Sequence, residues 1–224
     1  MKSILIIGLG RFGSYTARKL FEQGHEVMGV DQQAEMVEKA MAYLSSGQIG
    51  DSTDPDFLRS LGVRNFDVCI VAIGDDFKSS LVTTTLLKEM GVGHVVAQAS
   101  EDVHEFLLKR MGADDIIYPH KQLGEWAAVR FGSDHVTDFF RIDDEIAVYE
   151  MEVPEKWYGR TIGQLDIRRR FGISIIGIRE AVMKYGSGQP RTHTEVMIMP
   201  DMILKKDMTL LVLGDDARIR KCFK

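Results

Sequence analysis

Short apolar runs and amphipathic helical stretches take turns along the first half of the chain. The opening run, Ile4–Ile7, is apolar at every position, which is typical of a strand buried on both faces of a parallel sheet. The pattern predicts further strands at 26–31, 47–50, 68–73, 95–98 and 115–118. It predicts helices at 12–23, 34–44, 54–61, 79–90, 103–111 and 121–131. Strands and helices in alternation indicate right-handed crossovers and a doubly wound parallel sheet of the α/β class.

The pattern becomes that of a smaller domain beyond about residue 138. Apolar and polar positions alternate over 146–153, which predicts a half-buried strand. Further short strands are predicted at 173–178, 196–199 and 209–213. The glycines and the proline within 184–191 indicate a flexible loop. We therefore expect an α/β domain at 1–137, followed by a small, mostly antiparallel α+β domain at 138–224.

Charge and composition narrow the class of protein. The 224 residues carry 28 lysines and arginines against 33 aspartates and glutamates, a net charge of −5. This balance argues against broad nucleic-acid binding, which needs a field that attracts phosphate. No apolar run approaches the roughly 20 residues of a membrane-spanning helix, and no secretory signal is visible. The two cysteines, Cys69 and Cys222, have no metal-binding or redox spacing, so we expect a cytoplasmic protein.

A glycine-rich motif, GxGxxG, occupies Gly8–Gly13 between the first predicted strand and the first predicted helix. In a Rossmann-type fold, Gly8 would allow the tight turn and Gly10 would let the main chain approach a pyrophosphate. Gly13 would let the helix pack closely on the strand. The main-chain N–H groups and the positive end of the helix dipole would then face the phosphates. The alternative is a strand–turn–helix that binds no ligand.

An acidic residue, Asp31, ends the second predicted strand about 20 residues after the glycine motif. A carboxylate at this position accepts hydrogen bonds from the ribose hydroxyls of an adenine nucleotide. The residues that follow, Gln32 and Gln33, are neutral, and a carboxylate with no basic neighbour repels a 2′-phosphate. The motif and Asp31 together predict an adenine-nucleotide site that disfavours NADP.

Two more strand ends contribute candidate residues. Asp51–Thr53 follows the third strand, where it would either contact an adenosine or cap the helix that begins near Pro55. Gly74, after the fourth strand, would permit close approach of a nucleotide, whereas Arg11 would either pair with phosphate oxygens or be solvated. The predicted binding residues are Gly8, Gly10, Arg11, Phe12, Gly13, Asp31, Asp51, Ser52, Thr53, Ile73 and Gly74.

Motifs for catalysis and metal binding are missing from the sequence. There is no HExxH, GxSxG or Walker-type GxxxxGK[ST] motif. Tyr15 and Lys19 form a YxxxK pair, but both lie on the first helix behind the glycine motif, and we interpret the pair as coincidence. The run Arg168–Arg170 fits a solvated helix end, with an anion clamp as the alternative. We therefore expect no catalytic residue and no enzyme; the alternative is an NAD-dependent oxidoreductase.

The glycine motif, together with Val30–Asp31, Gly50–Thr53 and Val71–Gly74, resembles the N-terminal domain of the RCK family, also called KTN. In the second half, Gly159–Arg168 resembles the start of the family's C-terminal domain and Asp207–Gly214 its final strand. The resemblance covers essentially the whole chain. Members are cytosolic regulatory subunits of bacterial potassium-uptake systems of the Ktr and Trk type, and the single Rossmann copy here is closer to the Ktr subunits.

The resemblance implies a cytoplasmic protein at the inner face of the cell membrane, docked on an integral-membrane potassium-translocating subunit. Members form homodimers that assemble into rings, usually octamers. They bind ATP or ADP, or in some members NAD or NADH, and the nucleotide sets the shape of the ring and thereby the opening of the pore. By position in the motif, Arg11 would reach the phosphates, Asp31 the ribose, and Asp51 and Thr53 the adenosine.

The resemblance extends to a second ligand and shows one departure. In some members the C-terminal domain binds cyclic di-AMP, in a region that corresponds here to Ile167, Arg168, Ile175 and Ile176. Many Ktr subunits carry a glutamate of a divalent-cation site where this chain has His120. A neutral imidazole is a poor ligand for Mg²⁺ or Ca²⁺, so no metal site is predicted.

Overall fold

The computed structural model describes residues 1–143, 145–183 and 190–223. The chain forms two compact units, Met1–Gln122 and Leu123–Lys224, which divide within helix α6 (Pro119–Phe131). The boundary expected from the sequence, at 137/138, lies inside the second unit and stays a prediction. Among the described residues no helix combines the length and the apolar character that crossing a bilayer requires.

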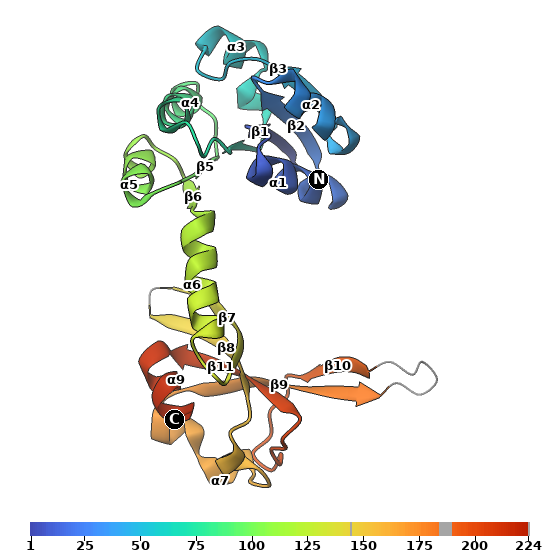
Figure 1. Ribbon diagram of the computed structural model, residues 1–224, viewed down its shortest axis with the longest axis vertical. Coiled ribbons are helices and arrows are strands. Elements are labelled where there is room, and N and C mark those ends of the chain that lie inside the picture. The colour runs from blue at the N-terminus through green and yellow to red at the C-terminus, as the bar shows by residue number, and fades with distance from the viewer. Residues whose placement is uncertain (144, 184–189, 224) are drawn as a thin grey trace. The chain divides into compact units, whose positions relative to one another are not determined.

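The first unit contains a sheet of six parallel strands in the order β3-β2-β1-β4-β5-β6 (Figure 1). The strands are β1 (Ser3–Ile7), β2 (Glu26–Asp31), β3 (Ser46–Ile49), β4 (Val68–Val71), β5 (Val95–Gln98) and β6 (Asp115–Ile117). The helices are α1 (Arg11–Glu22), α2 (Ala34–Ala40), α3 (Pro55–Ser60), α4 (Phe77–Glu89) and α5 (Asp102–Arg110), with short turns η1 (Met41–Tyr43) and η2 (Val63–Asn65). The predicted doubly wound α/β fold is confirmed.

Both faces of this sheet are buried, as the continuous apolar run of β1 indicates. Ile4 and Ile6 pack on one face with residues of α1 and α2, whereas Leu5 and Ile7 pack on the other face with residues of α3, α4 and α5. Cys69 is buried on the second face. Side chains alternate across a strand, so helices on both sides are needed to exclude water from all of β1.

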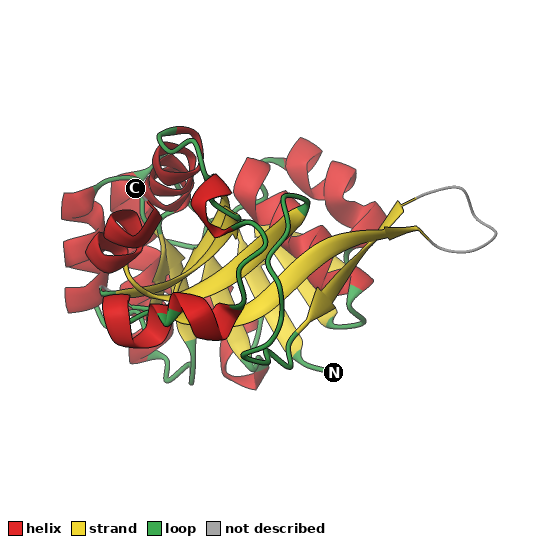
Figure 2. Ribbon diagram, turned by 90° about the horizontal axis from the view of Figure 1, so that it is seen from below, coloured by secondary structure: helices red, strands yellow, loops and turns green. Residues whose placement is uncertain are grey.

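The second unit contains an antiparallel sheet in the order β10-β9-β11-β8-β7. Its strands are β7 (Val136–Arg141), β8 (Ile146–Glu152), β9 (Ser174–Met183), β10 (Pro190–Glu195) and β11 (Met208–Asp215). Its helical segments are η3 (Glu155–Trp157), α7 (Ile162–Leu165), α8 (Ile167–Phe171) and α9 (Asp216–Phe223). Strands β9 and β10 pair as a projecting arm (Figure 2). The expected α+β second domain is confirmed.

Helices cover one face of this second sheet. Inward residues of β8 and β11, such as Tyr149 and Leu210, form one cluster with Leu165 of α7 and with Ile219 and Cys222 of α9. All five of these side chains are buried. The run of arginines after Ile167 lies in the short helix α8, which agrees with the expected helix end.

One sequence-based prediction fails in the second unit, and another falls mostly outside the described residues. The strand predicted at 196–199 is an irregular segment, in which Val196 is 73% and Met197 71% exposed. The strand lies just before it, in β10, where the polar residues Thr192–Glu195 pair with β9. Of the loop predicted at 184–191, residues 184–189 lie outside the described residues, and the last two belong to β10.

Candidate functional site

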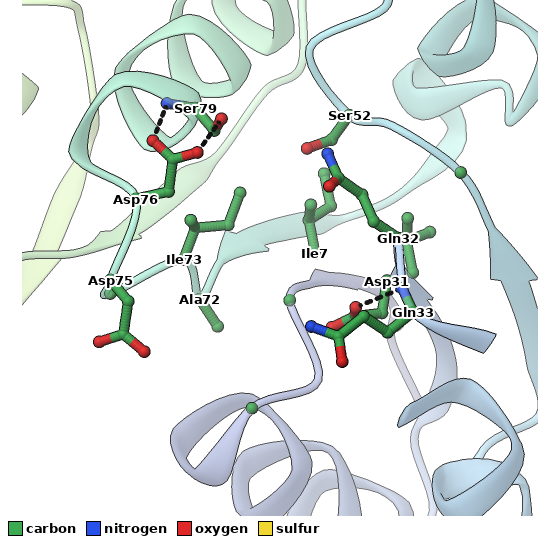
Figure 3. A pocket seen from close by; sticks show the side chains of 15 residues that line it. Ile7, Asp31, Gln32, Gln33, Ser52, Ala72, Ile73, Asp75, Asp76 and Ser79 are labelled. Atoms are coloured by element: carbon green, nitrogen blue, oxygen red, sulfur yellow. Dashed lines mark hydrogen bonds between the residues drawn. The ribbon is translucent and has the colours of Figure 1, made fainter. Parts of the chain in front are cut away.

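A pocket of about 230 Å³ opens at the carboxyl edge of the first sheet, where the strand order reverses between β1 and β4. Ligands of open α/β sheets bind at this kind of switch point. Figure 3 shows Asp31, Gln32 and Gln33 on one side of the opening and Asp75 and Asp76 on the other. The lining residues are Ile7, Gly8, Gly10, Val30, Asp31, Gln32, Gln33, Gly50, Ser52, Ala72, Ile73, Gly74, Asp75, Asp76 and Ser79.

The three glycines of the motif meet different surroundings. Gly8 has φ = +96°, and a Cβ atom there would lie 2.7 Å from the carbonyl oxygen of Ala72. At Gly13 a Cβ atom would lie 1.9 Å from the carbonyl oxygen of Gly8, because α1 packs directly on the turn. At Gly10 a Cβ atom would meet nothing within 4 Å. Gly8 and Gly13 therefore serve close packing of the chain, whereas Gly10 borders open space that a ligand can approach.

The start of α1 is free to bind an anion. Gly10 is the N-cap residue, and no side chain of the described chain caps this helix end by a hydrogen bond. The first N–H groups of a helix lack partners within the helix and carry its positive dipole end. Arg11 is exposed and Phe12 is half-buried, and neither lines the pocket. An anion bound at this end of the helix would first contact main-chain amides.

Asp31 connects the end of β2 to the glycine loop. Its Oδ2 atom accepts a hydrogen bond of 2.7 Å from the N–H of Leu9, and its Oδ1 atom accepts one of 2.9 Å from the N–H of Gln33. A carboxylate offers about four acceptor positions, so two stay available to hydroxyl donors. The residue predicted to bind ribose thus lines the pocket and also orders the turn.

The segment after β3 separates into three roles. Asp51 Oδ1 accepts hydrogen bonds from the N–H and the hydroxyl of Thr53, at 2.8 and 2.7 Å, and these bonds lower the pKa of Asp51. Asp54 caps α3 by accepting from the N–H of Asp56 at 2.9 Å. Of Asp51, Ser52 and Thr53, only Ser52 lines the pocket, and its buried hydroxyl lies 2.8 Å from that of Thr83. Asp51 and Thr53 thus bond to each other and lie outside the pocket lining.

The end of β4 brings a capped helix to the opposite wall. Ile73 and Gly74 line the pocket as predicted residues. Asp76 caps α4, with its carboxylate accepting from the N–H of Ser79 at 3.0 Å and from the Ser79 hydroxyl at 2.6 Å. These bonds lower the pKa of Asp76. Sequence reasoning did not assign Asp76 or Ser79 to the site, although an aspartate directly before a helical stretch is a helix-start signal.

The charge of the pocket is negative. Asp31, Asp75 and Asp76 line it, and the described lining includes no lysine or arginine. A polyphosphate bound here would therefore depend on the amides at the start of α1 rather than on cationic side chains. The outer wall made by Asp75 and Asp76 would favour hydroxyl groups over phosphates near it.

Residues that sequence reasoning set aside lie away from the pocket. Tyr15 is 65% exposed, and Lys19, on the same helix, pairs with Glu22. His120 is exposed on α6. Within the described ranges no group of three or more histidine, cysteine, aspartate or glutamate residues is arranged to hold a metal ion.

Comparison with known proteins identifies both units. Residues 4–119 match the model of the TrkA-N domain, and residues 147–224 match the model of the TrkA-C domain. The chain is 39% identical over 223 residues to the Ktr system potassium uptake protein C of Bacillus subtilis, covering 98% of this chain and 95% of the relative. It is 31% identical over 222 residues to the Ktr system potassium uptake protein A of the same organism, with 98% and 95% coverage.

Solved structures agree with these domains. The RCK domain of GsuK superposes with a TM-score of 0.66 at 21% identity, over 99% of this chain and 47% of that chain. The GsuK channel bound to NAD superposes with a TM-score of 0.66 at 22% identity, over 97% of this chain and 38% of that chain. At this level of identity the likeness shows the fold. The two domain matches and the full-length relatives show that the chain belongs to the family built from TrkA-N and TrkA-C domains, the RCK family.

Proposed function

We propose that this chain is the nucleotide-sensing regulatory subunit of a bacterial potassium-uptake system of the Ktr type. The observation that carries the proposal is the open edge of the glycine loop at Gly10, in a chain similar along 98% of its length to Ktr potassium uptake proteins. The relatives are named for potassium uptake, which favours regulation of transport over the alternative of an NAD-dependent oxidoreductase.

ATP or ADP is the proposed ligand, with NAD or NADH as the second candidate. All four share an adenosine and a pyrophosphate. The free acceptor positions of Asp31 would bind the ribose hydroxyls, and the amides near Gly10 would bind the pyrophosphate. A γ-phosphate would extend beyond the loop, and exposed Arg11 is the cationic residue of the motif that could bind it. The likeness in fold to a channel bound to NAD supports keeping the second candidate.

Regulation would act by differential affinity. We propose that homodimers assemble into a ring, with an octamer expected, on the cytoplasmic face of an integral-membrane potassium-translocating subunit. A nucleotide shifts such a ring only by as much as it binds one shape better than another. A change from 1:99 to 99:1 needs about 5.5 kcal/mol in total, which several sites of one ring can share.

Cyclic di-AMP is a further candidate ligand of the second unit. A cavity of about 310 Å³ is lined by Ile167, Arg168 and Ile175, three of the four residues named for this ligand by family resemblance. The fourth residue, Ile176, does not line it. An arginine beside apolar isoleucine side chains is suited to a phosphate that carries a purine.

Native mass spectrometry of the purified chain tests the leading proposal, because it reports subunit number and bound nucleotide together. We expect a ring-sized particle that gains mass with ATP or ADP. Thermal unfolding with ATP, ADP, NAD or NADH gives the matching energetic result, about 2.7 kcal/mol of stabilisation at 100 times Kd. A monomer that responds to none of the four would refute the proposal. Turnover in a hydride-transfer assay would favour the oxidoreductase instead.

A further inference from the structure

Three cationic side chains surround a small cavity in the second unit. The cavity measures about 160 Å³ and is lined by Lys156, Arg160, Leu165 and Arg170, together with Trp157, Phe171 and Cys222. It is smaller than the cavity of about 230 Å³ at the glycine loop. It shares no lining residue with the cavity that contains Arg168. The described lining includes no aspartate or glutamate, so the cavity has a single sign of charge.

The three cations have no counter-charge of their own. None of Lys156, Arg160 and Arg170 takes part in an ion pair in the described part of the chain. Like charges that face a common space repel one another, and the repulsion is relieved when an anion enters. An anion that enters the cavity would therefore be attracted by all three charges.

Three buried residues of the lining, which we call the floor of the cavity, would strengthen the attraction of an anion to the three cations. Trp157, Leu165 and Cys222 are 5%, 1% and 1% exposed, so the charges lie over a dry, apolar surface. Burial raises the pKa of the Cys222 thiol to about 11, while the positive charges of Lys156 and Arg170 act in the opposite direction. Both cations line the cavity together with Cys222. Coulombic attraction is larger beside such a surface than in open water.

Hydrogen bonds hold the main chain of Arg160 and the side chain of Arg170 in place. The N–H of Arg160 donates to the carbonyl oxygen of Trp157 at 3.1 Å, and its own carbonyl oxygen accepts from the N–H of Leu204 at 3.0 Å. The guanidinium of Arg170 donates to the carbonyl oxygen of Leu165 at 3.4 Å and lies 5.3 Å from the centre of the Phe171 ring. Less freedom of the Arg170 side chain is then lost when a ligand binds.

We propose that this cavity, formed by η3, the segment after it, α7, α8 and α9, binds a small phosphate-type oxyanion, either free phosphate or the phosphate of a larger molecule. Two guanidinium groups and one ammonium group around a compact space suit a tetrahedral dianion, whose oxygens point in several directions. A carboxylate carries a single negative charge on two oxygens, so it would balance less of the positive charge than a phosphate dianion does. The proposal is independent of the nucleotide site.

Titration calorimetry of the full chain with inorganic phosphate, at constant ionic strength, tests the proposal. We expect Lys156→Gln, Arg160→Gln and Arg170→Gln each to weaken phosphate binding by about tenfold or more, the loss of one charge-assisted hydrogen bond. Arg169→Gln is the matched control, because Arg169 is exposed on the same helix and lines neither cavity. It should bind as the unchanged protein does.

Further experiments distinguish free phosphate from a lipid headgroup, and phosphate from carboxylate ligands. Co-sedimentation with phosphatidylglycerol vesicles distinguishes a lipid headgroup from free phosphate, and either result supports the site if Lys156→Gln abolishes it. If Arg170→Gln fails to fold, Lys156→Gln and Arg160→Gln still give the test, since both side chains are exposed. The proposal is overturned if neither inorganic phosphate nor the vesicles bind, if acetate or succinate binds more tightly than phosphate, or if the three variants bind as well as Arg169→Gln.

Discussion

The main-chain N–H of Leu9 donates a 2.7 Å hydrogen bond to Oδ2 of Asp31, so the carboxylate that faces the pocket also holds the glycine loop in place. Leu9 itself is buried, and its side chain packs with Ile6 and Ala17 on the α1 face of the sheet. The loop is therefore anchored from both sides, by a buried side chain and by the acidic end of β2. Binding of a ribose at Asp31 would act directly on the conformation of the loop.

Replacing Asp31 by alanine should remove most of the stabilisation by adenine nucleotides. The variant loses the ribose acceptor and the anchor of Leu9 together, so about 2.7 kcal/mol at 100 times the unchanged Kd should largely disappear. Thermal unfolding with and without ADP measures this. Asp67→Ala is the matched control, because Asp67 also accepts a main-chain N–H, from Ser3 at 2.8 Å, but lies outside the pocket lining. Equal loss in both variants would contradict a special role for Asp31.

Alanine at Gly13 should lower folding stability, whereas alanine at Gly10 should mainly abolish nucleotide binding. At Gly13 the new Cβ atom would lie 1.9 Å from the carbonyl oxygen of Gly8, so we expect a loss of folding stability of at least 1–3 kcal/mol, roughly the cost of overpacking. At Gly10 the Cβ atom meets nothing within 4 Å, so stability should change by at most about 1 kcal/mol while nucleotide binding is lost. Urea unfolding and titration with ADP separate the two effects. A Gly10→Ala variant that binds ADP normally would show that the ligand does not approach there.

The spacing of sequence motifs predicts some of the residues that line the pocket, but not the orientation of polar side chains at the strand ends. Gly8, Gly10 and Asp31 follow from the spacing of one motif, and the structure places all three in the pocket lining. Asp51 and Thr53, which the family resemblance assigns to the adenosine, bond to each other and lie outside the pocket lining. Which way a polar side chain turns at a strand end depends on local hydrogen bonds, and the spacing of residues along the chain does not encode this.

In the fold as well, some elements are predictable from the sequence and others are not. Continuous apolar runs identify the buried parallel strands, because burial on both faces leaves a strong signal. Strand β7 (Val136–Arg141) was missed because its register shifts between Val136 and Asp138, and because Phe140 is 71% exposed, so no clean alternation results. Helix α4 begins at Phe77, two residues before the predicted start, because Asp76 caps it. Edge strands and helix ends depend on single contacts, which hydrophobic periodicity does not report.

NADP and NADPH should bind at least about tenfold more weakly than NAD and NADH. A ribose at Asp31 would bring a 2′-phosphate against a carboxylate in a pocket whose described lining offers no lysine or arginine. Titration calorimetry with the four dinucleotides measures the ratio, and Asp31→Ser should reduce it because the repelling charge is gone. Equal affinities in the unchanged protein would place the ribose away from Asp31.

His104 is a buried histidine that links α5 to α4, the helix whose first turn forms one wall of the pocket. Its Nδ1 atom lies 3.3 Å from the N–H of Ser100, and its Nε2 atom lies 3.2 Å from the hydroxyl of Ser80. The ring packs against Phe77 at 4.6 Å between centres. The Ser100 N–H requires Nδ1 to be an acceptor, so the neutral ring carries its proton on Nε2. A second proton would have to be placed on Nδ1, where it would break this contact.

Acidification below about pH 6.5 should therefore destabilise the fold through His104. Burial lowers the pKa of His104 from its ordinary 6.5, although the charge of Glu101 acts in the opposite direction. Between the lowered pKa and 6.5 the unfolded chain binds the extra proton and the folded chain does not, so the free energy of unfolding falls as the pH falls. The slope for one such proton is at most about 1.4 kcal/mol per pH unit, and above pH 6.5 the effect vanishes.

Urea unfolding between pH 7.5 and 5 measures how the free energy of unfolding depends on pH. The slope should be shallower for His104→Gln, whereas His120→Gln, at an exposed histidine, should keep the slope of the unchanged protein. Equal slopes in all three proteins would exclude His104 as the source of the acid sensitivity.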